Sequence, residues 1–164
     1  MIKDILLLGD PMLYEVSEEI KESEKERLEG WVRDLHDTLM EYRRVHGAGR
    51  AIAAPQIGLR KRLLYMHTDK PYIFVNPVLT FPDGESYELW DDCMSFPGLL
   101  VRVRRHKRAV ISYLDGALLP QTMALEGDLA ELLQHEYDHL DGILATMRAV
   151  DGRSFCLGEM KRDF

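Results

Sequence analysis

The chain has 164 residues, of which 46% are hydrophobic and 30% are charged, as is ordinary for one globular domain spanning residues 1–164. Its formal net charge of −7 opposes contact with a nucleic-acid backbone, so we expect no direct nucleic-acid binding. No apolar run approaches the roughly 18 residues that a membrane span requires, and the apolar N-terminal stretch is too short for a signal peptide. These features predict a cytoplasmic protein without a membrane partner.

A long amphipathic helix is the first strong element. Ser23 and Glu26 have the spacing of a capping box, and apolar residues recur at helical spacing after them. The pattern predicts a helix from Ser23 to about Gly47. The following segment, 47–58, is rich in small residues and closes with a proline and a glycine, which indicates a loop or an irregular edge. Small residues there would let the backbone of a ligand approach closely.

Between Arg62 and Leu125 the sequence consists of short runs of β-branched and aromatic residues separated by turn residues. This pattern predicts strands. The basic run 101–108 lies in this region, and its alternating apolar residues indicate a strand with a solvated charged face rather than a nucleic-acid-binding surface. The expected strands are Leu63–His67, Tyr72–Asn76, Val78–Phe81, Ser86–Trp90, Leu99–Arg105, Ala109–Leu114 and Met123–Leu125.

A second helix is expected from Asp128 to Gly142. The Asp128 carboxylate has the position of a cap, with Glu131 three residues further on. Strands followed by a core helix predict an α+β domain in which this helix packs on the sheets. The residues expected to face inward are Leu129, Leu132, Leu133 and Leu140.

The second helix carries the chemistry. His135 and His139 are four residues apart, so both imidazoles lie on one face of the helix and can reach one metal ion, with Glu136 beside them. A bound divalent ion activates a water and polarises a carbonyl, while the carboxylate takes the proton of the water and passes it to the leaving group. This combination predicts an amide hydrolase. Gln134 and Asp138 are expected to orient the two imidazoles.

Catalytic sites of this type use three protein ligands, and three patterns compete for the third one. A second histidine motif beyond Gly142 fails because Ala145 stands where a histidine is required. Glu159 has the spacing of a downstream glutamate ligand, but the short remaining chain leaves little room for the helix that would carry it. Cys93 offers a thiolate from a turn-like segment after a predicted strand, whereas Cys156 has no such role.

Three separated segments resemble the peptide deformylase family, in the family's own order. The glycine-rich motif of the family resembles segment 49–58, and its Glu-Gly-Cys-Leu-Ser motif resembles segment 91–95, which reads Asp-Asp-Cys-Met-Ser here. Its HExDH motif matches segment 134–142 throughout, and Gly-Asp-Pro-Met-Leu at 9–13 is also typical of the family. The similarity spans roughly residues 5 to 147, and the three motifs in this order are highly specific.

The resemblance implies a fold in which antiparallel β-sheets pack around a central HExxH helix, with an N-terminal helix. It also implies an enzyme that removes the formyl group from the N-formyl-methionine of nascent peptides, releasing formate. Fe(2+) is the usual metal of the family, and Zn(2+), Ni(2+) or Co(2+) can occupy the isolated protein. The implied partners are N-formylated nascent peptides and the ribosome, the second weakened by the short tail after the HExDH helix.

The resemblance assigns a role to each matching residue. It implies that Cys93, His135 and His139 bind the metal, that Glu136 is the general acid and base, and that Gln56 and the backbone N–H of Met94 steady the oxyanion. It places Gly49, Arg50, Ala51 and Asp92 along the substrate groove.

The chain departs from the family in this groove. Ala51 replaces a glycine and adds a methyl group, and Asp92 replaces another glycine and adds a carboxylate beside Cys93. A negative charge there is expected to disfavour acidic substrates. Asp91 replaces the family's glutamate, and Arg105 stands at the distance expected for its ion-pair partner.

These departures leave two alternative functions open. One is a deformylase-like hydrolase that acts on another formylated or small amide substrate, which Ala51 and Asp92 suggest. The other is a catalytically silent metal-binding descendant, although a silent protein has no need to keep Glu136 and Gln56.

Overall fold

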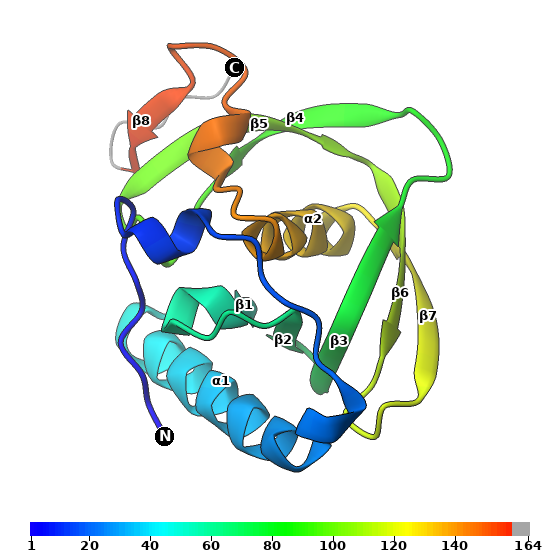
Figure 1. Ribbon diagram of the computed structural model, residues 1–164. Helices are drawn as coiled ribbons and strands as arrows, with labels where there is room; N and C mark the ends of the chain where they lie inside the picture. Colours follow the sequence, from blue (N-terminus) through cyan, green and yellow to red (C-terminus); the bar gives the residue numbers. More distant parts are fainter. Residues whose placement is uncertain (159–164) are drawn as a thin grey trace.

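The structure is a computed structural model, and it describes residues 1–158. Two antiparallel sheets surround a central helix α2 (Asp128–Leu140), and helix α1 (Lys25–His46) covers the outer face of the larger sheet, as Figure 1 shows. The expected α+β architecture is therefore confirmed. Within residues 1–158, no helix has the length and apolar character needed to cross a membrane.

The sheets are built entirely from antiparallel pairs between named strands. The larger sheet has the order β1-β2-β3-β6-β7 and consists of β1 (Ala51–Ala53), β2 (Leu63–His67), β3 (Pro71–Thr80), β6 (Arg108–Leu114) and β7 (Pro120–Glu126). The smaller sheet has the order β4-β5-β8 and consists of β4 (Ser86–Asp91), β5 (Leu99–His106) and β8 (Phe155–Leu157). Short 3-10 turns span Pro11–Tyr14, Glu22–Glu24, Ala54–Ile57 and Ala145–Arg148.

The strands β1 and β2 are buried on both faces, and so is the centre of β3 at Phe74 and Val75. Successive side chains of a strand point to opposite faces, so Leu64 and Met66 of β2 join the core around α2, whereas Leu63 and Tyr65 join the core under α1. This double burial explains why the sequence of β2 is a continuous apolar run rather than an alternating one. It also fixes α2 firmly against the sheet, which matters because α2 carries the predicted metal ligands.

One irregularity joins two of the expected strands. Most of the expected strands Tyr72–Asn76 and Val78–Phe81 lies in the single strand β3, which ends at Thr80, and its pairing with β6 shifts between Val75 and Val78. Asn76 has a positive φ of 48° at this point, and its side-chain amide bonds to both backbone groups of Ile20, at 2.8 and 2.9 Å. A β-bulge held by a side chain therefore replaces the break that the sequence suggested.

The helix ends differ partly from the prediction. Ser23 lies in the 3-10 turn Glu22–Glu24, and the backbone N–H of Lys21 donates to Glu24 Oε2 at 3.0 Å, so the capping box expected at Ser23 is wrong. The predicted end is confirmed, because Gly47 follows α1 in the left-handed conformation, with φ of 68°.

The start of α2 also differs from the prediction. Asp128 is the first helical residue, and its side chain makes no capping hydrogen bond, because Gly127 with φ of 60° precedes the helix. Leu129 is 37% exposed rather than buried, whereas the other three leucines of the helix do face inward. The expected end near Gly142 is confirmed.

The segment 47–58 contains more regular structure than its composition indicated. Ala51–Ala53 forms β1 at the edge of the larger sheet, and Ala54–Ile57 forms a 3-10 turn directly after it. The small side chains of Ala51 and Ala53 pack toward α2, where larger ones would hold the helix away. The segment thus brings an edge strand alongside the helix that carries the histidines.

Candidate metal and catalytic site

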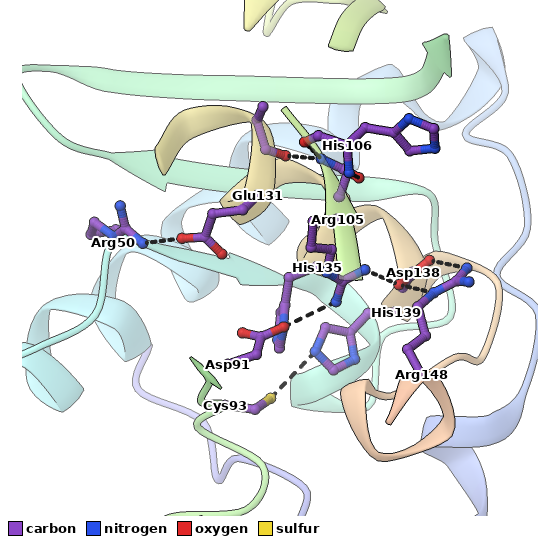
Figure 2. Close-up of polar contacts among 12 residues, drawn as sticks. Arg50, Asp91, Cys93, Arg105, His106, Glu131, His135, Asp138, His139 and Arg148 are labelled. Atoms are coloured by element: carbon purple, nitrogen blue, oxygen red, sulfur yellow. Dashed lines mark hydrogen bonds and ion pairs between the residues drawn. The ribbon is translucent and has the colours of Figure 1, made fainter. Parts of the chain in front are cut away.

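Three side chains from two separate elements meet beside α2. Cys93 lies in the loop after β4, and His135 and His139 lie one turn apart on α2. One potential ligand atom of each residue lies within 4.8 Å of the others, and Cys93 Sγ is 3.4 Å from His139 Nε2 (Figure 2). All three side chains are buried. The three residues that the sequence singled out are thus brought together.

The donor set suits a divalent transition metal. One thiolate and two imidazoles are three ligands, which is the number that catalytic metal sites use while one position stays open. Burial holds the pKa of His139 well below its usual value, so its imidazole is neutral and available as a ligand. The residues present therefore fit one metal ion.

His135 is oriented by Asp91, the last residue of β4. The ring atom Nδ1 of His135 lies 2.9 Å from Asp91 Oδ2, and because the carboxylate only accepts, Nδ1 donates and Nε2 is left for a metal. Burial acts to raise the pKa of Asp91, but the charges and hydrogen bonds of His135 and Arg105 outweigh it and lower that pKa. An ionised Asp91 therefore fixes the ring.

A buried ion-pair network extends from Asp91 behind the helix. Arg105 donates to Asp91 at 3.0 Å, so the pair expected from the sequence is confirmed, and it also donates to Asp138 at 2.6 Å. Arg148 completes the network with two bonds to Asp138, at 2.6 and 2.8 Å (Figure 2). This network ties β4, β5 and the turn at Arg148 to α2.

The roles predicted for Gln134 and Asp138 are wrong. Gln134 bonds to both backbone groups of His106, each at 2.9 Å, and so attaches α2 to β5. Asp138 binds arginines rather than an imidazole. Asp91 has the orienting role, and the sequence indicated it only as a partner of Arg105; Arg148 was not anticipated at all, since nothing in its local sequence marks it.

Glu136 and Gln56 flank the cluster. Glu136 is 4% exposed, and burial raises its pKa to about 7. Among the described residues its Oε2 atom has no hydrogen-bond partner. Gln56 accepts from the backbone N–H of Ala53 at 2.9 Å, and its amide nitrogen faces the cluster, where it donates to Ser95 Oγ at 3.1 Å and to Cys93 Sγ at 3.5 Å. A proton acceptor and a hydrogen-bond donor thus face the same small space.

A cavity of about 290 Å³ opens onto this cluster. The residues that the sequence placed in the site border this cavity, except His139, which is not among its lining residues. Met94 and Asp92 flank Cys93 on one wall, while Arg50 and Ala51 line another at the start of β1.

Glu159, the alternative ligand considered from the sequence, lies outside the described residues. The ion pair between Arg50 and Glu131, at 2.9 Å, joins the strand side of the cavity to α2 (Figure 2).

Comparisons with known proteins agree with this geometry. The sequence model of the family described as polypeptide deformylase matches residues 2–154. The chain is 35% identical to "Peptide deformylase 1" of Prochlorococcus marinus over 166 aligned residues, which cover 94% of this chain and 84% of that protein. It is 34% identical to "Peptide deformylase 1" of Nitrosomonas europaea, with 94% and 92% covered.

Solved structures show the same fold. A peptide deformylase from Synechococcus elongatus in complex with actinonin superposes with a TM-score of 0.84 at 28% identity, covering 92% of this chain and 80% of that one. The peptide deformylase from Thermotoga maritima superposes with a TM-score of 0.83 at 29% identity, covering 92% and 99%. Sequence and fold agree over nearly the whole chain, and the chain belongs to the peptide deformylase family.

Proposed function

We propose that Cys93, His135 and His139 hold one divalent metal ion and that the site removes the formyl group from the N-formyl-methionine of nascent peptides. The observation that carries this assignment is the approach of the three ligand atoms to within 4.8 Å at the end of a cavity. Deformylation by a metal-dependent hydrolase is the activity of the family to which the chain belongs.

The bound metal would polarise the formyl carbonyl and lower the pKa of the attacking water. We propose Fe(2+) as the ion loaded in the cell, because the cluster combines a soft thiolate with two imidazoles, and such donors suit iron as well as zinc, nickel and cobalt. The metal content of the protein purified without oxygen tests this assignment.

Glu136 is the proposed proton carrier. A group whose pKa is near 7 can both accept and release a proton at neutral pH, and Glu136 has this property because it is buried. It accepts a proton from the attacking water as the new carbon–oxygen bond forms. It then delivers this proton to the peptide nitrogen as the carbon–nitrogen bond breaks, which leaves formate and a free amino terminus.

Gln56 and the backbone N–H of Met94 are the proposed oxyanion donors. The bond from the Ala53 N–H to Gln56 Oε1 keeps the amide nitrogen on the side of the cluster, where it can donate to the charge that develops on the formyl oxygen. The substrate backbone would lie along Gly49, Arg50 and Ala51, because β1 is an edge strand and an extended peptide can pair with its free edge. This pairing is supported by the position of the cavity beside β1.

The substrate also indicates where the enzyme works. Nascent formylated peptides leave the ribosome in the cytoplasm, so we propose that the enzyme acts there and meets the ribosome while it acts. Cosedimentation of the protein with translating ribosomes tests the second statement.

Formate release from formyl-Met-Ala tests the activity. The Fe(2+)-loaded protein, prepared without oxygen, is expected to release formate, and Glu136→Gln is expected to lower kcat by at least about 100-fold while metal is retained. Retained activity in Glu136→Gln would remove Glu136 from the mechanism, and no formate from the metal-loaded parent protein would overturn the proposed function.

A comparison of substrates separates this function from its alternatives. The departures at Ala51 and Asp92 suggest another formylated or small amide compound as the competing substrate class. Turnover of formyl-Met-Ala above every non-methionyl formamide excludes that class. Loss of activity in Glu136→Gln with metal retained excludes the silent metal-binding protein.

A further inference from the structure

Asp92 is a carboxylate without a partner at the rim of the cavity. It directly precedes Cys93, it borders the cavity, and its side chain is exposed. Within residues 1–158, no hydrogen bond or ion pair involves this side chain. An exposed charge that has no internal partner keeps its full interaction with whatever enters the cavity.

Two of the other three carboxylates that border the cavity are balanced by neighbours, and the third, Glu136, is buried and has its pKa raised to about 7. Asp91 is held by His135 and Arg105. Glu131 is paired with Arg50, which also borders the cavity, so these two charges compensate each other (Figure 2). Asp92 therefore leaves the mouth of the cavity with an excess negative charge.

The charge of Asp92 reaches the cavity wall. Tyr42 stands in that wall, and the pKa of its phenol is raised first by burial and then by the charges of Asp92 and Cys93. The phenolate form is thus disfavoured partly because the carboxylate lies nearby. A substrate side chain in the same space meets the same negative potential.

We propose that Asp92 makes the enzyme select formylated peptides with a cationic side chain at the second or third residue over peptides with an acidic one. The inference rests on the proposed function, which brings the formyl group to the cluster. Asp92 is one residue from Cys93, so their Cα atoms are about 3.8 Å apart. With the formyl group at the cluster, the residues that follow formyl-Met would leave the cavity past the exposed side chain of Asp92. A lysine or arginine stem is long enough to bring its charge to the carboxylate there.

Peptides that differ in one charge test the inference. We would measure kcat/KM for formyl-Met-X-Ser-amide and formyl-Met-Ser-X-amide, with X as Lys, Gln or Glu. In at least one series the Lys peptide is expected to exceed the Glu peptide by about three- to tenfold at low salt, with Gln between them. The ratio is expected to approach one at about 500 mM salt, because an exposed charge is screened.

Two variants identify the residue responsible. Asp92→Asn is expected to abolish most of the Lys-to-Glu ratio. Glu19→Gln removes the same charge from an exposed residue outside the walls of the cavity and is expected to keep the ratio.

The outcomes separate this inference from the proposed function. Equal kcat/KM values for all peptides at low salt, or a ratio that survives in Asp92→Asn, would overturn the inference and leave deformylation standing. No formate from any peptide while the metal is bound would reject deformylation itself, and the inference with it.

Discussion

Asp91 connects the cluster of candidate metal ligands to the ion-pair network of Arg105 and Asp138. A single oxygen, Oδ2, accepts from His135 at 2.9 Å and from Arg105 at 3.0 Å, in a position that is only 5% exposed. The carboxylate therefore fixes one imidazole and at the same time shares with Asp138 the compensation of the buried charge of Arg105. Asp91 thus acts both as a hydrogen-bond acceptor for His135 and as a negative charge beside Arg105.

Replacement of Asp91 separates these two contributions. Asp91→Asn keeps the shape but loses the charge, and we expect the affinity for metal to fall about 10- to 100-fold, because the partner of a ligand imidazole sets its orientation and basicity. Competition with a chromophoric chelator, using Co(2+), measures this affinity. Asp91→Glu restores the carboxylate and is expected to recover much of the loss.

The charge-matched control is Asp69→Asn, which changes an exposed carboxylate away from the cluster. Asp69→Asn is expected to leave the affinity for Co(2+) unchanged. An Asp91→Asn protein that binds Co(2+) as tightly as the parent would show that the hydrogen bond to His135 has no influence on the metal site.

The sequence predicted the candidate metal ligands, but it did not predict which side chains hold those ligands in place. The four-residue spacing of His135 and His139 dictates that they share a face, and the motif containing Cys93 supplied the third donor. The prediction for Gln134 was wrong because its side chain faces β5, and helical spacing alone does not show which strand lies on that side of the helix. Only the fold shows that Gln134 reaches His106 and that Asp91 reaches His135.

Gly142 determines how closely the N-terminal segment approaches the end of α2. Its φ is 71°, and a Cβ placed there would collide with the backbone carbonyl of Tyr14. The nearby bond from the Ser17 N–H to the Leu140 carbonyl, at 2.9 Å, shows that this segment also satisfies the open end of the helix. One glycine thus allows the N-terminal segment to cap the helix that carries the ligands.

Two glycine substitutions are expected to have opposite effects on stability. Gly142→Ala combines an unfavourable φ with a backbone collision, so we expect the free energy of unfolding to fall by at least about 2 kcal/mol. Gly30→Ala lies inside α1, where nothing is within 4 Å of the added methyl group, and is expected to raise it by about 0.5 to 1 kcal/mol.

Urea titration monitored by far-UV circular dichroism measures both free energies of unfolding. Gly30→Ala is the matched control, because it makes the same chemical change. Equal effects of the two substitutions would contradict the role assigned to the close approach at Tyr14.

At the element scale, the sequence predicted regular segments better than their ends. β2 has the predicted bounds, because an apolar run closed by polar residues has few alternatives. The cap at Asp128 was misplaced, since the positive φ of Gly127 depends on how β7 turns into the helix. β8 was missed, because three residues carry too little pattern and the strand exists only through its pairing with β5.

The whole molecule is organised around the cluster. α2 packs on the larger sheet, whereas Cys93 follows β4 of the smaller sheet, so the ligand atoms come from both layers. The layered arrangement was predictable from the resemblance of the motifs, although no local pattern shows which sheet a loop belongs to. A metal held by all three residues would therefore connect the two layers.

Metal binding is expected to stabilise the whole fold. An ion that binds only the folded state at about 100 times its Kd adds about 2.7 kcal/mol, which corresponds to a rise in Tm of roughly 5 to 11 °C for a chain of this size. Calorimetry with Co(2+) and with a chelator should give one transition in both cases, as expected for one domain. Cys93→Ala removes one ligand and is expected to lose most of the rise. Two separate transitions would contradict the single domain, and an unchanged Tm would contradict a metal shared between the layers.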